Sequence, residues 1–348
     1  MSPGASSLQT FVSRLPKAEL HLHLEGSIRP DTLRELSRAK NRLHQESEDW
    51  IDKRIRSNFK YQSPQEFLEA FKLVTLLLES PQDYALITTR LCEWLAEQNV
   101  KYAEVTLSAG VILWKKQPVD AIFEAIQAAA ADAAARLGIR VQWIFDAIRH
   151  FGLDHARQVL KWAARLRAQG VVAFGIGGDE TRGPANLFTQ VYREARDAGL
   201  HVTAHAGEFG GPESIRAAVE LLGAERIGHG LTAARDPALM AMLCERHVPL
   251  EVCPTSNVCT GLVPRFEDHP LPRFLEAGLI VTLNSDDPGL FGTSLEQEFS
   301  RSAEAFGFAP EQLAGFSENA VRVSFLPEDE KEALLKTLRS ELAMGGGT

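Results

Sequence analysis

Residues 171–176 read VVAFGI and residues 202–206 read VTAHA, and between them a helical pattern runs from Asn186 to Ala198 and stops at Gly199. A short apolar run followed by a longer helical pattern and a second apolar run is typical of a strand–helix–strand unit, which requires a parallel sheet. Glycine just past the last periodic residue is a common helix stop. This stretch therefore predicts parallel strands joined by helices.

The same alternation recurs along the whole chain. Eight short apolar runs precede turn signals, at residues 18–24, 102–108, 141–148, 171–176, 202–206, 226–229, 249–253 and 279–284. Eight parallel strands close a barrel, whereas an open doubly wound sheet usually carries a G-x-G-x-x-G turn after its first strand, and none follows Leu24. We therefore expect an α/β fold, a (β/α)8 TIM barrel.

Two segments are longer than the barrel requires. Residues 25–101 separate the first two runs, and they contain periodic blocks at 31–39 and 64–78. We expect a helical insertion after strand 1, over residues 31–99, that lies over the C-terminal mouth and could act as a lid. Extra helices are also expected after strand 8, with residues 11–343 forming a single domain.

Composition excludes several classes of protein. The chain has 348 residues, of which 37 are basic and 46 acidic, so its net charge of −9 argues against a nucleic-acid binder. Four cysteines are too few for a disulfide scaffold, and neither a signal peptide nor an uninterrupted apolar stretch of about 18 residues is present. We expect a cytoplasmic protein without a membrane or nucleic-acid partner, and the sequence leaves its oligomeric state open.

Polar residues at the ends of the predicted strands point to a metal site. His21 and His23 are two apart, so on a strand both imidazoles face the barrel interior, and His205 lies within an apolar strand. Each signal has a plainer interpretation, because paired histidines can simply pack and the NSDDP sequence around Asp286 can simply begin a helix. We nevertheless predict His21, His23, His205 and Asp286 as metal ligands, since functional side chains of this fold gather at the C-terminal strand ends.

Three imidazoles and one carboxylate suit one Zn²⁺ per chain better than calcium or magnesium. Zinc lowers the pKa of a bound water to about 7, so the site favours hydrolysis. Glu208 is then a candidate proton donor, and His229 and Asp287 are candidates for orienting and deprotonating the water. Other histidines, including His269, are expected at the surface.

Six motifs lie at or near the predicted strand ends: PKAELHLHLEGSI (16–28), GGDE (177–180), AHAGE (204–208), RIGHG (226–230), EVCPTSN (251–257) and NSDDP (284–288). Together and in this order they resemble the adenosine deaminase family of metal-dependent aminohydrolases, from about Leu15 to about Ala320. The resemblance implies that zinc is held by the four predicted ligands and that Glu208 protonates N1 of a 6-aminopurine. It also implies that the backbone N–H of Gly178 meets N3 of the ring.

The resemblance leaves the substrate less defined. Adenosine deaminases carry Asp at the position of Glu25, where it binds the ribose 5′-hydroxyl, so the ribose end of this pocket is expected to differ. The second strand, YAEVTLSAGVILWKK (102–116), is similar to bacterial enzymes that act on 6-amino-6-deoxyfutalosine, a nucleoside of menaquinone synthesis whose 5′ chain carries a benzoate. Such a substrate needs a nearby cation, and we predict Arg149 for this role.

Three other functions are kept open. One is deamination of adenosine and deoxyadenosine, and a second is another amidohydrolase reaction, because a barrel alone does not determine function. The third is a catalytically inactive relative that serves as a binding protein, although the presence of Glu208, His229, Asp286 and Asp287 together argues against it.

Overall fold

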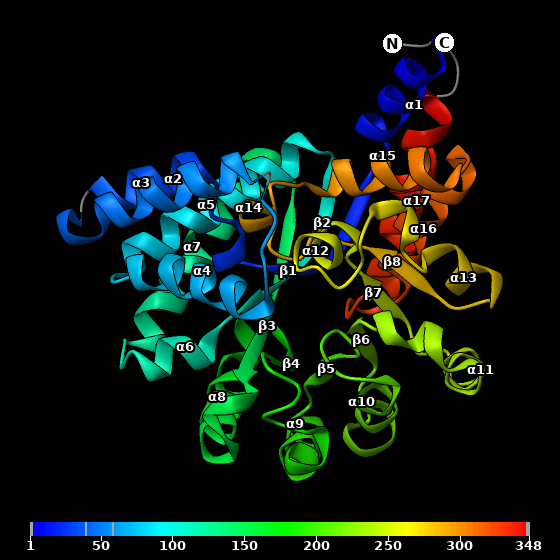
Figure 1. Ribbon diagram of the computed structural model, residues 1–348. Helices are drawn as coiled ribbons and strands as arrows, with labels where there is room; N and C mark the ends of the chain where they lie inside the picture. The colour runs from blue at the N-terminus through cyan, green and yellow to red at the C-terminus, as the bar shows by residue number, and fades with distance from the viewer. Residues whose placement is uncertain (1–2, 39, 58, 346–348) are drawn as a thin grey trace.

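The computed structural model describes residues 3–38, 40–57 and 59–345. Within these residues, eight parallel strands follow one another around a single sheet in sequence order (Figure 1). They are β1 (Lys17–His23), β2 (Val100–Leu107), β3 (Arg140–Ile148), β4 (Val171–Gly177), β5 (His201–Ala206), β6 (Arg226–His229), β7 (Leu250–Val252) and β8 (Val281–Leu283). Each overlaps one predicted apolar run, and the predicted TIM-barrel fold is confirmed.

The barrel closes where β8 meets β1. Leu22 forms a parallel bridge with Asp286, because His23 N–H donates to the Asp286 carbonyl at 2.9 Å and Asp286 N–H donates to the His21 carbonyl at 3.1 Å. The side chain of Asn284 strengthens this closure, since its Oδ1 accepts from the N–H groups of Leu20 and His21 at 3.0 and 3.1 Å. Three of the predicted metal ligands therefore belong to the seam of the barrel.

Helices surround the strands, and the apolar core lies between the two layers. The helices between strands are α6 (Ala109–Trp114), α7 (Val119–Leu137), α8 (Leu153–Leu166), α9 (Thr189–Asp197), α10 (Pro212–Ala217), α11 (Pro237–Glu245), α12 (Pro254–Cys259) and α13 (Leu271–Glu276). The segment before β8 is not one continuous helix: a 3₁₀ turn covers Phe266–Asp268, and α13 starts only after Pro270. Proline lacks an N–H and disfavours the helical conformation of the residue before it, so the break occurs there.

The long segment between β1 and β2 is helical. It contains α2 (Pro30–Arg38), α3 (Asn41–Arg56), α4 (Pro64–Leu77) and α5 (Pro81–Glu97), which lie together on one side of the barrel in Figure 1. Ser63 and Ser80 accept hydrogen bonds from the first turns of α4 and α5, and each is followed by a proline at the first helical position. These signals explain why two helices start where they do.

Helices from the two ends of the chain pack together. Helix α1 (Pro3–Arg14) precedes β1 and contacts α15 (Leu295–Phe306), α16 (Pro310–Arg322) and α17 (Glu328–Gly345), as Figure 1 shows. The short helix α14 (Pro288–Phe291), which follows β8, lies instead beside the insertion, where Phe291 stacks on Phe67 of α4. Among the described residues, no helix combines the length and apolarity needed to span a bilayer.

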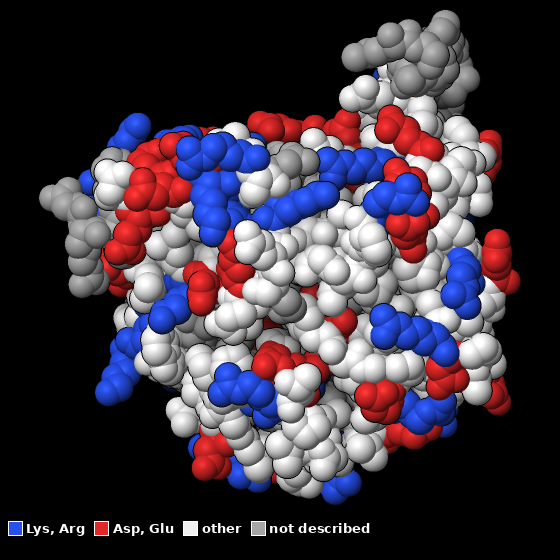
Figure 2. Space-filling model, in the orientation of Figure 1, with Lys and Arg blue, Asp and Glu red and all other residues white. Residues whose placement is uncertain are grey.

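Charges on the visible face are mixed. Figure 2 shows a band of Lys and Arg side chains across the upper part of this face, with Asp and Glu side chains at both ends of the band. Two neighbouring basic residues of the insertion, Lys53 and Arg54, both pair with Glu66, at 2.5 and 2.9 Å. The local positive charge is therefore partly neutralised.

Candidate active site

Four histidines and one aspartate from four different strands meet inside the C-terminal mouth of the barrel. This inner cluster comprises His21 and His23 from β1, His205 from β5, His229 from β6 and Asp286 after β8. The structure thus brings together the four predicted ligands. It also places His229 close enough to be a fifth donor, because its Nε2 lies 3.9 Å from Asp286 Oδ2.

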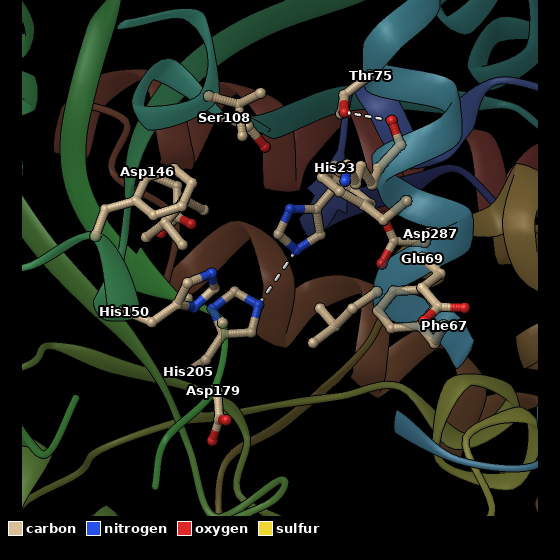
Figure 3. Close-up of a pocket in the computed structure, with 18 of the residues that line it drawn as sticks. His23, Phe67, Glu69, Thr75, Ser108, Asp146, His150, Asp179, His205 and Asp287 are labelled. Atoms are coloured by element: carbon tan, nitrogen blue, oxygen red, sulfur yellow. Dashed lines mark hydrogen bonds between the residues drawn. The ribbon is translucent and has the colours of Figure 1, made fainter. Parts of the chain in front are cut away.

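The spacing within the inner cluster fits a tetrahedral ion. His23 Nε2 lies 3.2 Å from His205 Nε2, as drawn in Figure 3, and Asp286 Oδ1 lies 3.4 Å from both His21 Nε2 and His23 Nε2. Ligand atoms that sit about 2.0–2.1 Å from one tetrahedral zinc are about 3.3–3.4 Å apart. His21 Nε2 is moreover buried without a hydrogen-bond partner among the described residues. The donor set and its spacing therefore suit a divalent metal.

Burial also prepares the imidazoles for metal binding. It lowers the pKa of His23 to about 4 and that of His205 well below its usual value. Burial has the same effect on His229, whose pKa falls to about 3. Neutral imidazole is the form that ligates a metal, so these rings are available near neutral pH.

Backbone strain is concentrated at two residues of this site. His229 has φ 61° and Asp286 has φ 64°, both in the left-handed region that residues with a side chain rarely adopt. Such conformations cost roughly 1–3 kcal/mol and persist where the surroundings enforce them, most often at functional sites. At Asp286 the surroundings are Glu19, whose Oε1 accepts from the N–H and hydroxyl of Ser285 at 2.7 and 2.6 Å.

The loop that carries Glu208 is held by another carboxylate. Glu180, from the GGDE motif after β4, accepts hydrogen bonds from four successive N–H groups, those of residues 207–210, at 2.9–3.1 Å. The sequence did not predict this role, because the two loops are far apart along the chain. Glu208 itself is 9% exposed and its Oε2 lies 3.6 Å from His229 Nε2. Burial, together with the charges of Asp286 and Glu180, raises the pKa of Glu208 well above its usual value, so the carboxyl can retain a proton.

His229 is in contact with Asn257, which in turn contacts His269, a residue that was predicted at the surface. His269 was predicted at the surface, but it is 3% exposed, and its Nε2 lies 3.1 Å from Asn257 Oδ1. The amide of Asn257 in turn lies 3.4 Å from His229 Nδ1. The surface prediction is wrong because the 3₁₀ turn before α13 packs against α12, the helix that carries Asn257.

Asp287 lies beside the inner cluster and next to a glycine that makes room for it. Its Oδ1 is buried without a partner among the described residues. A Cβ on Gly26 would overlap this oxygen, so the LEG sequence after β1 is required for Asp287 to occupy its place.

A cavity of about 480 Å³ opens over the inner cluster. Gly178, with φ 86°, lines it together with His23, His205, Asp286 and Asp287. Farther out, part of the wall is apolar; we call this part the outer chamber, and its residues are Phe67, Leu68, Phe71, Trp114 and Phe151. The first three belong to α4, so the helical insertion supplies one wall of the cavity, and Figure 3 shows Phe67 on this side.

Two residues predicted at the ribose end lie behind the cavity wall. Glu25 is 1% exposed, and its carboxyl accepts from the N–H of Ser108, which does line the cavity. Arg149 is 2% exposed, and its guanidinium donates to the carbonyls of Gly183 and His205. Neither is among the described residues that line the cavity.

Five charged residues of the cavity wall were not predicted as site residues: Glu69, Lys72, Asp146, Asp179 and Arg182. Asp146 near the end of β3 lines the cavity, and burial raises its pKa to about 8. Lys72 and Arg182 line it farther out, and both side chains are exposed and form no ion pair with a described residue. Only the alternation of inward-facing and outward-facing residues along β3 could have indicated Asp146. No local sequence pattern marks Lys72 and Arg182.

Comparison with known proteins agrees with this geometry. A family model described as adenosine deaminase matches residues 16–341. An aminodeoxyfutalosine deaminase of Streptomyces avermitilis is 38% identical over 92% of this chain and 89% of its own length. An adenosine deaminase of Serratia proteamaculans is 36% identical over 94% of this chain and 99% of its own.

Two solved structures extend the comparison. An adenine deaminase from Arthrobacter aurescens superposes with a TM-score of 0.85 at 29% identity, covering 94% of this chain and 98% of its own. An amidohydrolase from Burkhoderia ambifaria with bound Zn superposes with a TM-score of 0.84 at 28% identity, covering 97% of this chain and 93% of its own. Three of these four relatives are named as deaminases, and they differ in the purine compound that they are named for.

Proposed function

This chain belongs to the adenosine deaminase family and is a hydrolytic deaminase, and we propose that it acts on a 6-aminopurine nucleoside with an enlarged 5′ substituent, 6-amino-6-deoxyfutalosine in particular. The observation that carries the chemistry is the inner cluster beside Glu208 in one cavity. The observation that favours the enlarged substrate is the aromatic outer chamber.

We assign the metal to His21, His23, His205 and Asp286, and zinc held there would make water a nucleophile near neutral pH. Glu208 donates its proton to N1 of the purine, which makes C6 electrophilic. His229 and Asp287 would orient the attacking water toward C6 and accept one of its protons. The C6–O bond would form first, and that proton would then pass to the amino group, so that the C6–N bond breaks and ammonia leaves. The remaining hydroxyl proton would return to Glu208, while N1 keeps the proton that Glu208 gave.

Purine binding would place the N3 edge at Gly178. Gly178 lines the cavity, and its φ of 86° is one that a residue with a side chain would rarely adopt. A Cβ at this position would also lie 3.3 Å from the His150 ring. We propose that glycine here keeps the ring's edge close to the backbone.

The outer chamber supports a substrate larger than adenosine. A ribose 5′-hydroxyl needs hydrogen-bond partners, whereas Phe67, Phe71 and Trp114 offer apolar and aromatic surface. The Streptomyces avermitilis relative named for aminodeoxyfutalosine supports the same substrate. An aryl group attached through the 5′ position would bury apolar area against this wall.

A carboxylate on that aryl group requires a cation. We propose Lys72 and Arg182 for this role in place of Arg149, because they line the cavity and form no ion pair within 4.0 Å of a described carboxylate, although the charge of Arg182 helps to lower the pKa of Asp179. The Arg149 guanidinium is already occupied by two backbone carbonyls. Exposed cations of this kind contribute selectivity and encounter rate more than affinity.

The first test is ammonia release from adenosine, deoxyadenosine, adenine and aminodeoxyfutalosine. We expect kcat/KM for aminodeoxyfutalosine to be well above that for adenosine. Equal or reversed preference would contradict the enlarged substrate and leave adenosine deamination, which the Serratia proteamaculans relative supports. No release from any of the four would favour an inactive binding protein.

The second test removes the cations. Lys72→Gln and Arg182→Gln should each lower kcat/KM for aminodeoxyfutalosine by about tenfold, while adenosine deamination stays unchanged, because each pairing is partly solvated. Lys161→Gln, at an exposed position of α8 outside the cavity, is the matched control. Equal losses on both substrates would exclude a role in carboxylate recognition.

A further inference from the structure

A chain of buried charges runs from the inner cluster into the interior of the barrel. It begins at His21, whose Nδ1 lies 2.9 Å from Glu251 Oε2. A carboxylate only accepts hydrogen bonds, so Nδ1 donates the proton of this contact, and Nε2 is the ring nitrogen left to bind a metal. That Nε2 is the buried atom without a partner on the side of Asp286. Glu251 therefore selects the tautomer that His21 needs as a metal ligand.

Glu251 is itself fixed by an arginine. Arg226 Nε donates to Glu251 Oε1 at 2.6 Å, and Arg226 Nη2 donates to Glu104 Oε2 at 2.6 Å. The guanidinium also lies 3.7 Å from the centre of the Phe325 ring. One planar fork thus joins β6, β7 and β2 below the inner cluster, with geometry that a lysine cannot reproduce.

Glu104, at the far end of this chain of charges, also has hydrogen-bond partners. Glu104 Oε1 accepts from Tyr102 Oη at 2.8 Å and from the Phe325 N–H at 2.5 Å. Arg226 Nη1 donates to the Val323 carbonyl at 3.0 Å. The segment after α16 is thereby tied to β2 and β6, and β6 ends at His229 of the inner cluster.

The charge balance of this network is negative. Glu104, Glu251 and Arg226 are 0–2% exposed, and two carboxylates with one guanidinium give a net charge of −1 behind His21. A buried excess charge is costly unless an opposite charge is near. A divalent cation beyond His21 supplies that charge, so the network is complementary to an occupied site.

We propose that Glu251 and Arg226 are positioning residues of the metal site: Arg226 fixes Glu251, and Glu251 orients His21 toward the ion. The inference rests on the metal site of the proposed function but not on the identity of the purine. Carboxylates that orient metal-bound histidines typically change metal affinity by 10–100-fold when they are removed.

The test compares metal binding with stability. Zinc affinity is measured by chelator competition, and unfolding by urea is followed with and without zinc, for Glu251→Gln, Arg226→Lys and Arg226→Met. We expect Glu251→Gln and Arg226→Met to weaken zinc binding by about 10–100-fold and to reduce the stability gained on adding zinc. Arg226→Lys should fall between these variants and the unaltered chain.

The matched control is Arg54→Met in the helical insertion. Arg54 is also 2% exposed, pairs with Glu66 at 2.9 Å and lies 4.5 Å from the Tyr61 ring, but it belongs to α3, outside the inner cluster. We expect this variant to lose stability equally with and without zinc. If Glu251→Gln behaves like Arg54→Met, the residues are merely structural and the inference is overturned.

Two further outcomes separate the inference from the proposed function. A chain that binds zinc tightly but deaminates no purine contradicts the function, and the affinity loss in Glu251→Gln would still support positioning. A chain that binds no divalent metal overturns both. Should Arg226→Met fail to fold, Glu251→Gln and Arg226→Lys carry the test.

Discussion

The inner cluster and the outer chamber lie in one cavity but are built in opposite ways. Residues of the inner cluster come from strand ends, and His21, His229 and Asp286 are 1–3% exposed. His229 and Asp286 adopt strained backbone conformations. Buried carboxylates such as Glu19 and Glu251 hold residues of the cluster or their chain neighbours in place by hydrogen bonds. The outer chamber is built mostly from side chains of α4, α6 and the β3 end, several of them partly exposed.

The difference separates chemistry from substrate choice. A rigid, buried site can hold reacting groups in a fixed orientation. A displacement of about 1 Å in such a site can lower the rate by about a hundredfold. Side chains of an apolar wall on an inserted helix can be substituted with a smaller effect on the rate of the chemical step. We therefore expect changes at the inner cluster to affect every substrate, and changes in the outer chamber to affect only large ones.

The largest expected effect comes from Glu208→Gln. The amide cannot donate a proton to N1, so kcat should fall by about a thousandfold or more with every substrate. Zinc content, measured by atomic absorption, should stay at one ion per chain, because Glu208 is not an assigned ligand.

Glu213→Gln is the control for this change, since Glu213 is exposed in the helix that follows the same loop. It should retain normal turnover. Turnover of Glu208→Gln close to that of the unaltered chain would remove Glu208 as the proton donor.

A smaller but still general effect is expected for Gly26→Ala. The added methyl group would overlap Asp287 Oδ1 and displace this side chain. We expect kcat to fall by about a hundredfold for both adenosine and aminodeoxyfutalosine, with zinc content unchanged.

Gly315→Ala provides the comparison, because a Cβ at this position in α16 meets open space. Alanine in a helix interior should raise the free energy of unfolding by about 0.5–1 kcal/mol without altering turnover. Normal activity in Gly26→Ala would show that the position of Asp287 is not critical.

The smallest and most selective effect is expected for Phe71→Ala in the outer chamber. Removing one aromatic side chain should lower kcat/KM for aminodeoxyfutalosine by about tenfold and leave adenosine almost unaffected. Phe306→Ala, a partly buried phenylalanine of α15 outside the cavity, is the control. Equal losses on both substrates would contradict the division between the two regions.

Much of this site could be predicted from the sequence because strand geometry is simple. A spacing of two places His21 and His23 on one face, and parallel strands deliver their C-terminal ends to one rim. The support of the site could not be predicted. Glu180 accepts hydrogen bonds from the loop of Glu208, which follows the next strand along the chain. His269 lies in a loop that packs against Asn257.

By itself, the sequence determined the barrel and which side chains meet at its mouth, because hydrophobic periodicity and chain order specify a parallel eight-stranded sheet. Only the tertiary structure decided that Arg149 donates to backbone carbonyls and that Lys72 and Arg182 line the cavity. It also decided that Arg226 is linked to His21 through Glu251. The direction of a long charged side chain depends on partners brought by distant segments, and no local pattern encodes them.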